Sequence, residues 1–201
     1  MGIKITLADK GLSFEERRVA LTGLCLRVFD SISDALRLTL SGKYSASIIH
    51  LRDVLETSFL LDLLLDKENG AVEWLKASET ILRKEFSPVE VRKKLDARDG
   101  FTERKREKHY KLLSSLGPHP SLKAFETKRD GQRNINVGPF KNERLLEACI
   151  EEIARISFAA SVQILRYAIC DFFDVEHLRP RLTLAQQKMR EKHPVVCTTG
   201  L

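Results

Sequence analysis

YSASIIHLRDVLETSFLLDLLLD, residues 44–66, is the stretch on which the predicted fold depends. Its apolar residues follow the three- and four-residue spacing of one helical face. They are Ile48, Leu51, Leu55, Phe59 and Leu63, with Ile49, Leu60 and Leu64 beside them. A helix that is apolar over so much of its surface must be covered on several sides, so we expect it to lie at the centre of the molecule.

Capping signals mark further helices on both sides of this central helix. Ser13-Phe14-Glu15-Glu16 is a capping box that opens a helix with an apolar stripe, and Gly42 ends that helix. Asn69-Gly70 ends the central helix itself. Later helices are predicted at about 71–86, from Ser87-Pro88 to Asp99-Gly100, at about 102–116, at about 143–173 after the cap residue Asn142, and from Thr183 onward.

The helical pattern is interrupted once, between His119 and Phe140. Gly117-Pro118 ends the preceding helix, and the Asp130-Gly131 pair favours a tight hairpin turn. We therefore predict an all-α fold, an antiparallel helical bundle with a basic loop or small β-hairpin inserted at about 117–141 before the last long helix. No linker divides the chain, so we expect residues 1–201 to form a single helical domain.

The positive charge is concentrated in the middle of the chain. Residues 83–144 carry 17 Lys and Arg against 9 Asp and Glu, whereas residues 1–82 carry 10 against 12 and residues 145–201 carry 7 of each. The formal net charge of +6 therefore comes from the middle segment. A surplus of this kind favours contact with a polyanion.

Several functional classes have no support in the sequence. No apolar run is long enough to span a membrane and the N-terminus lacks the apolar core of a secretory signal, so we expect a cytoplasmic protein. The four cysteines lie far apart without a CxxC pair, which favours reduced thiols and no metal site. GxGxxG, Walker A and HExxH motifs are absent, and no cofactor is implied.

Arg104 and His109 bracket four residues in RKREKH, residues 104–109. This spacing resembles the RxxxxH element of the HEPN-like superfamily, helical-bundle proteins of which many are metal-independent ribonucleases in toxin and phage-defence systems. The resemblance implies that Arg104 stabilises the scissile phosphate, that His109 transfers protons, and that a homodimer joins two such pairs in one cleft. On a regular helix, however, Lys105 and Arg106 are nearer neighbours of His109, and a solvated basic face is the alternative.

A broader pattern covers about residues 42–120. It consists of GKYSAS at 42–47, LRDVLE at 51–56, YKLLSS at 110–115 and His119-Pro120, and it is similar to uncharacterised bacterial helical proteins related to the HEPN group. On this resemblance His119 is the family histidine, and it shares a cleft with Arg52 and Tyr110. The alternative is that Arg52 forms an ion pair with Glu56, four residues further along the helix.

The insert adds cations without a platform for stacking bases. Lys128, Arg129 and Arg133 surround the Asp-Gly turn and, with Lys105 and Arg106, are candidates for phosphate contacts. Three hypotheses stay open: an RNA-binding protein or metal-independent ribonuclease, a non-catalytic helical module that binds a protein partner, and a binder of a small ligand in a pocket near Trp74. The sequence does not decide whether the protein is an enzyme.

Overall fold

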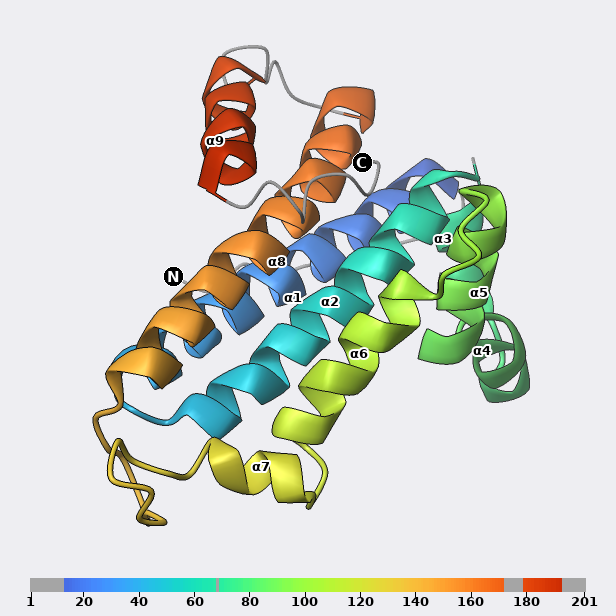
Figure 1. The fold of residues 1–201 in the computed structure, drawn as a ribbon. Helices are drawn as coiled ribbons and strands as arrows, with labels where there is room; N and C mark the ends of the chain where they lie inside the picture. The colour runs from blue at the N-terminus through green and yellow to red at the C-terminus, as the bar shows by residue number, and fades with distance from the viewer. Residues whose placement is uncertain (1–12, 68, 172–178, 193–201) are drawn as a thin grey trace.

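The computed structural model describes residues 13–67, 69–171 and 179–192 (Figure 1). Every regular element in these residues is a helix, which confirms the predicted all-α class. The helices are α1 Ser13–Leu40, α2 Tyr44–Leu65, α3 Gly70–Lys76, α4 Glu79–Glu85, α5 Pro88–Arg98, α6 Lys105–Leu116, α7 Leu122–Glu126, α8 Glu143–Asp171 and α9 Arg179–Lys192.

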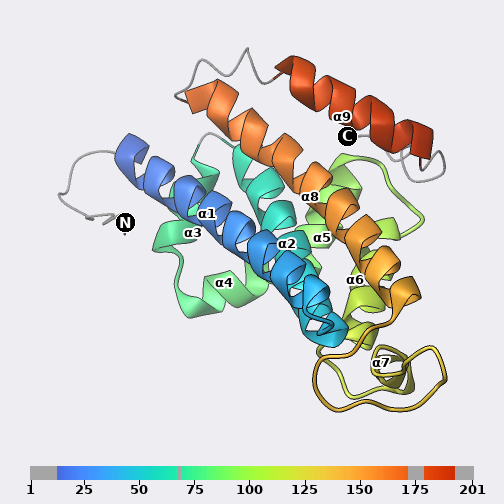
Figure 2. The same ribbon diagram turned by 90° about the vertical axis from the view of Figure 1, so that its left-hand side faces the viewer.

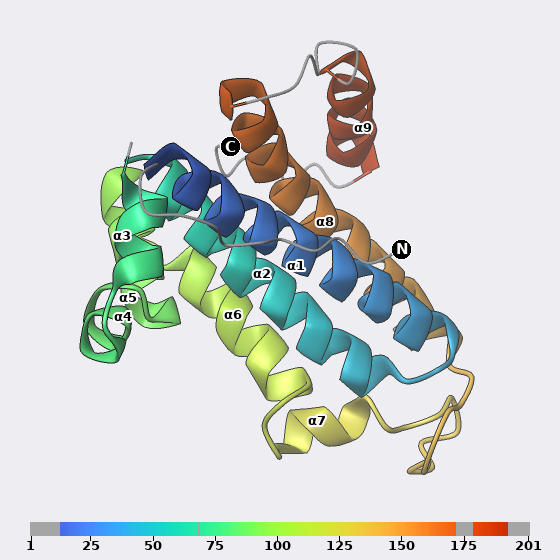
Figure 3. The same cartoon turned by 180° about the vertical axis from the view of Figure 1, so that it is seen from behind.

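The central position predicted for residues 44–66 is confirmed. Helix α2 packs against α1, α8, α6, α5 and α3, more neighbours than any other helix among those described, and Figures 2 and 3 show it between α1, α6 and α8. Leu51, Val54 and Leu61 on this helix have no exposed surface. Burial on several sides is the physical reason for its nearly continuous apolar sequence.

The three long helices do not alternate in direction. Tyr44 at the start of α2 shares a hydrogen bond with Asn142 just before α8, and Asp62 near the end of α2 binds Arg166 near the end of α8. Helices α2 and α8 therefore run parallel, while α1 runs opposite to both, since Thr22 near its start meets Tyr167. The prediction of an antiparallel bundle is wrong for the α2–α8 pair. Helix α6 returns the chain to the end at which α2 begins, since Gly117 after α6 lies beside Ile48 and Ile49.

The core consists of two apolar clusters along the same helices. The larger cluster includes Leu51 and Val54 of α2, Leu113 of α6 and Ile156 of α8. The smaller one, near the beginning of α1, includes Leu21, Leu61 and Ala71. The apolar stripes of the long helices thus meet one another, as their spacing predicts.

Some of the shorter elements differ from the sequence predictions. The helix expected at 71–86 is two helices, because Ala77 is extended (φ −67°, ψ 136°) and Ser78 begins α4 as a cap, accepting a hydrogen bond from the Ile81 N–H at 3.4 Å. Helix α9 begins at Arg179, before the predicted Thr183. The predicted end of the last long helix at Phe173 lies outside the described residues.

The insert contains a helix that the sequence pattern did not predict. Ser121 caps α7 by accepting from the Ala124 N–H at 3.2 Å. The turn that follows has one isolated antiparallel bridge, between Arg129 and Ile135, and the described part of the insert contains no β-strand. Asp130 organises this turn, since its Oδ1 accepts from the N–H groups of Gln132 and Asn134, each at 2.9 Å.

A membrane-spanning helix is not found among the described residues, because none of their helices is both long and apolar enough to cross a bilayer.

Candidate functional site

His109 of α6 meets two residues of α8, and we call His109, Glu152 and Arg155 the histidine cluster. His109 Nε2 lies 2.5 Å from Glu152 Oε1 and 3.2 Å from Arg155 Nη2. Arg155 also forms an ion pair with Glu152. The two α8 residues are three positions apart, so they share one side of the helix.

The histidine cluster is partly open to solvent. The side chains of His109, Glu152 and Arg155 are 23%, 21% and 32% exposed. Leu113, one turn after His109 on the same side of α6, is buried in the core. His109 therefore lies at the edge of the packed face of α6, where it can contact both α8 and water.

The charges of this cluster act on one another. Burial, the largest single influence, raises the pKa of Glu152, but the hydrogen bond and charge of His109 and the charge of Arg155 together hold it below its ordinary value. Because Nε2 faces the Glu152 carboxylate, it donates its proton there, and Nδ1 is the ring nitrogen left for another partner. A histidine held by a carboxylate beside an arginine can transfer protons next to a bound anion.

Arg104 does not take part in this cluster. It is the residue before α6, has a left-handed backbone (φ 52°, ψ 40°), and its side chain is 77% exposed beside Glu107 at 3.8 Å. The cation next to His109 is Arg155, from another helix. The motif predicts Arg104 beside His109, and the structure places Arg155 there instead.

Arg52 lies in a second arrangement, together with the ring of Tyr110. It forms an ion pair with Glu56 at 3.0 Å, and its guanidinium lies 5.0 Å from the centre of that ring. Arg92, from α5, lies 3.9 Å from the same ring centre and is 5% exposed. Burial lowers the pKa of Arg92, although the nearby Tyr110 and Glu56 partly offset this effect. The Arg52–Glu56 pair expected as the structural alternative is present.

His119 does not join Arg52 and Tyr110. It is exposed on the bend after α6, where its backbone N–H donates to the Ser114 carbonyl at 3.2 Å. Within the described ranges its ring makes no hydrogen bond and no ion pair. Of the three residues that the broader resemblance places in one cleft, the structure brings together Arg52 and Tyr110 but not His119.

Arg106 and Lys105 differ in their availability to a ligand. Arg106 is 13% exposed and bound by Asp96 at 2.6 Å and by Asp99, so its charge is already neutralised. Lys105 is 51% exposed and lies 3.2 Å from Glu103. Asp99 also binds Arg98, which pairs with Asp62, so Arg106 belongs to a structural network of ion pairs that joins α2, α5 and α6.

A groove lies where the Asp130 turn meets the start of α8, and we call it the basic groove. Its volume is about 640 Å³, and its lining includes four cations: Arg129, Arg133, Lys141 and Arg144. Arg129 and Lys141 each lie 3.3 Å from a neighbouring glutamate. Arg133 and Arg144 are exposed, without an ion pair to any residue in the described part of the chain. Lys128 is exposed on the same turn.

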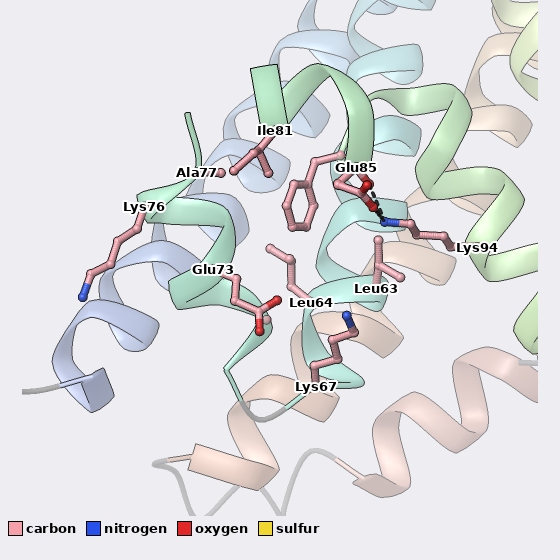
Figure 4. Close-up of a pocket in the computed structure, with 11 residues that line it drawn as sticks. Leu63, Leu64, Lys67, Glu73, Lys76, Ala77, Ile81, Glu85 and Lys94 are labelled. Atoms are coloured by element: carbon pink, nitrogen blue, oxygen red, sulfur yellow. Dashed lines mark hydrogen bonds and ion pairs between the residues drawn. The ribbon is translucent and has the colours of Figure 1, made fainter. Parts of the chain in front are cut away.

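An apolar cavity of about 380 Å³ lies between the end of α2 and helices α3, α4 and α5 (Figure 4). Its lining is Leu63, Leu64, Lys67, Gly70, Glu73, Lys76, Ala77, Ile81, Glu85, Phe86 and Lys94. One of the three hypotheses from the sequence places a ligand pocket near Trp74. Trp74 packs against the smaller core cluster instead, while its neighbours Glu73 and Lys76 line the cavity.

Three of these functional candidates were missed by sequence reasoning: Glu152, Arg155 and Arg144. The first two lie on the predicted inner helix, but nothing in a local pattern shows that they face a histidine from another helix. Lys141 and Arg144 flank the cap residue Asn142, and a pair of cations at the start of a long helix was a usable signal for an anion site.

In comparisons with known proteins, no protein-family model, curated protein or solved structure matches this chain.

Proposed function

We propose that this protein binds RNA or another polyanion through the basic groove. The observation that carries the proposal is the convergence of Arg129, Arg133, Lys141 and Arg144 on one groove. Two of these cations, Arg133 and Arg144, are exposed with no ion pair inside the described ranges, and so a phosphate need not displace a carboxylate to reach them.

The physical character of the groove favours phosphate over base recognition. Its lining contains no aromatic side chain on which a base could stack. The first backbone N–H groups of α8 lie at the same place, and the positive end of a helix dipole attracts anions. Binding of this kind depends little on sequence and falls steeply as the salt concentration rises.

The experiment is a fluorescence titration of labelled single-stranded RNA at several salt concentrations. The double variant Arg133→Glu/Arg144→Glu removes the two unpaired cations, and each lost phosphate contact lowers the salt dependence of binding by roughly 0.7. The matched control is Arg83→Glu/Lys84→Glu, which makes the same change in net charge at two exposed residues of α4, where the Arg83 side chain is 84% exposed. Equal loss in the control, or no binding by the wild type, would remove the proposal.

Ribonuclease activity, which the HEPN-like resemblance implies, is a further part of this proposal. In such a reaction His109 would accept the proton of the RNA 2′-hydroxyl as that oxygen attacks phosphorus and the bond to the 5′-oxygen breaks. Arg155, whose Nη2 lies 3.2 Å from His109 Nε2, would turn from its ion pair with Glu152 to stabilise the charged phosphate in place of Arg104.

The decisive assay is RNA cleavage without added metal. His109→Ala and Arg155→Ala should lose activity, whereas His119→Ala and Arg104→Ala should keep it, because neither of the latter contacts the histidine cluster. Cleavage at equal rates by all five proteins would show that the histidine cluster is not catalytic.

One observation favours the alternative, a helical module that acts by binding protein. Helix α1 carries large apolar side chains on its outer side: Leu26 and Leu36 are 37% and 39% exposed, and Phe29 and Leu40 are each 67% exposed. Together with Ser33 they are spaced alternately by three and four residues, the spacing of a coiled-coil seam. Figure 3 shows α1 on the side of the molecule that faces the viewer.

We propose that the partner on this seam is a second copy of the chain. In an antiparallel pairing of two α1 helices, Phe29 faces Leu40 of the partner, while Leu36 faces the small Ser33. Asp30 and Arg37 are seven residues apart on the flank of the seam, so Asp30 of one copy lies near Arg37 of the other and their charges are opposite. The Arg37 side chain is 82% exposed. The seam is therefore complementary to itself in both shape and charge.

Sedimentation equilibrium tests the homodimer. Phe29→Glu and Leu40→Glu should each convert it to a monomer, since they place a charge in the seam. Leu122→Glu is the matched control, because Leu122 is 85% exposed on α7, away from α1. A wild type that stays monomeric at high concentration would contradict the proposal.

A further inference from the structure

The apolar cavity between α2, α3, α4 and α5 has the features of a binding site for a small molecule. Leu63, Leu64, Ile81 and Phe86 form its walls, and its volume of about 380 Å³ lies within the range of ligand pockets. Leu64 is 1% exposed and belongs to the smaller core cluster, so the back of the cavity is a fixed part of the fold.

The backbone around the cavity explains why it is open. The extended residue Ala77 separates α3 from α4, so the two short helices diverge and leave space where a single helix would have packed. Gly70 lets α3 begin close to α2, because a Cβ at this position would lie 2.9 Å from the Leu64 carbonyl oxygen. The cavity is thus built by two local features of the chain.

Charged side chains surround this apolar space, and most of them already have partners. Lys94 binds Glu85 at 2.7 Å, and Lys76 binds Glu16 of α1 at 2.6 Å. Lys67 and Glu73 have no ion pair among the residues that the structure describes. Figure 4 shows the Lys67 ammonium and the Glu73 carboxylate reaching the same side of the cavity from the end of α2 and from α3.

We propose that this cavity binds a small zwitterion with an apolar body, of the kind represented by a free apolar α-amino acid. The ligand's carboxylate pairs with Lys67 and its ammonium pairs with Glu73, while its apolar side chain enters the space between Leu64, Ile81 and Phe86. An α-amino acid carries both charges on one carbon atom, so both face the same opening. That matches the common side from which Lys67 and Glu73 reach the cavity.

The same two residues discriminate against molecules with a single charge. A carboxylate without an amine brings its negative charge next to Glu73, and an amine without a carboxylate brings its positive charge next to Lys67. Like charges at an apolar site weaken binding, whereas a hydrogen bond between opposite charges strengthens it. The zwitterion is the ligand class that satisfies both residues.

Isothermal titration calorimetry with L-leucine and L-phenylalanine tests the proposal. Two analogues of L-phenylalanine serve as comparison ligands: 3-phenylpropanoate lacks the amine, and 2-phenylethylamine lacks the carboxylate. We expect the amino acids to bind at least about tenfold more tightly than either analogue, since each lost pair is a hydrogen bond between charged groups.

Protein variants separate the two charges from the apolar space. Glu73→Gln should weaken binding of the amino acid about tenfold and leave binding of 3-phenylpropanoate unchanged or tighter. Lys67→Gln should also weaken binding of the amino acid about tenfold, and it should leave binding of 2-phenylethylamine unchanged or tighter. Ile81→Arg should abolish binding by filling the cavity, while Val89→Arg, at an exposed valine of α5 outside the lining, should not.

Three results would overturn the proposal. The first is no binding of either amino acid by the wild type. The second is equal affinity for an amino acid and its single-charge analogues, and the third is unchanged affinity in Glu73→Gln. Lys67 and Glu73 are exposed, so their variants should fold, and circular dichroism of each protein checks this.

Discussion

His109 and Glu152, which are 43 residues apart in the chain, meet with 2.5 Å between Nε2 and Oε1. The contact joins α6, in the middle of the basic segment of residues 83–144, to α8, which carries five acidic and three basic residues. It fixes the orientation of the imidazole and gives α6 and α8 a direct polar link. Arg155 completes the arrangement, so the carboxylate is shared between an imidazole and a guanidinium.

The first prediction concerns Glu152→Gln and the pH dependence of stability. The pKa of Glu152 lies below its ordinary value of 4.5 in the folded protein, so its ionised form contributes stability that is fully present above that pH. This contribution is lost as the pH falls further, through the lowered pKa. Glu152→Gln should lower the free energy of unfolding at pH 7 by about 1–2 kcal/mol and have less effect at pH 3.

Urea unfolding at a series of pH values measures this difference. Glu147→Gln, at an exposed position on α8, is the control for a generic loss of negative charge. A constant difference between wild type and Glu152→Gln over the whole acid range would mean that the His109 contact does not stabilise the charged form.

The second prediction concerns the buried carboxylate of Asp62. Its side chain is 9% exposed, and it binds Arg98 at 3.0 Å and Arg166 at 2.6 Å, so it joins α2 to both α5 and α8. Hydrogen bonds to Asp99 and then to Asp62 hold the pKa of Arg98 above its ordinary value. Asp62→Asn leaves two arginines without this partner and should cost about 3 kcal/mol in the free energy of unfolding.

The neighbouring carboxylate of Asp66 provides the comparison. Asp66 also binds Arg98 and Arg166, but its side chain is 26% exposed, so water compensates more of the loss. Asp66→Asn should therefore destabilise the protein less than Asp62→Asn in urea or thermal unfolding. The reverse order would show that burial does not determine the strength of this network.

The sequence predicted those parts of the fold that depend on local pattern. The spacing of Leu51 and Leu55 predicts a central helix, and Gly42 marks the end of the first helix, because both signals act within a few residues. The break at Ala77 had a local signal too, in the cap residue Ser78. The periodic apolar residues on either side of it favoured one helix, and that interpretation was wrong.

The candidate site depends on contacts between distant segments, which local patterns do not contain. The motif from Arg104 to His109 identified a histidine that has an arginine beside it, yet the arginine is Arg155 from α8. The parallel direction of α2 and α8 was missed for the same reason. It follows from the return of the chain along α6 to the beginning of α2, and no spacing within α8 encodes it.

The third prediction concerns the thiols of Cys25 and Cys149. Burial raises the pKa of each to about 11, above the ordinary value of 9.0. The reactive thiolate at pH 8 is therefore about 100-fold less populated than in an unperturbed cysteine. We expect both residues to react slowly with iodoacetamide in the folded protein and at an ordinary rate in urea.

Peptide mass spectrometry assigns the modified cysteines one by one in this experiment. Raising the pH from 8 to 10 should increase the rate at Cys25, which is partly exposed, more than at the buried Cys149. Rapid modification of Cys149 in the folded protein at pH 8 would mean that the contact between α1 and α8 opens frequently.

The fourth prediction compares two glycines with left-handed backbones. Gly42 has φ +73° and Gly100 has φ +67°, so an alanine is strained to a similar degree at both, by about 1 kcal/mol. The surroundings differ, because a Cβ at Gly42 would lie 2.3 Å from the Phe140 carbonyl oxygen, whereas a Cβ at Gly100 meets no atom within 4 Å. Gly42→Ala must therefore also push the end of the insert away from α2.

Gly42→Ala should lower the thermal unfolding midpoint clearly more than Gly100→Ala does. It should also weaken polyanion binding, since the displaced segment leads into Lys141 of the basic groove. Equal midpoints for the two variants would show that the insert is not held against the α1–α2 turn.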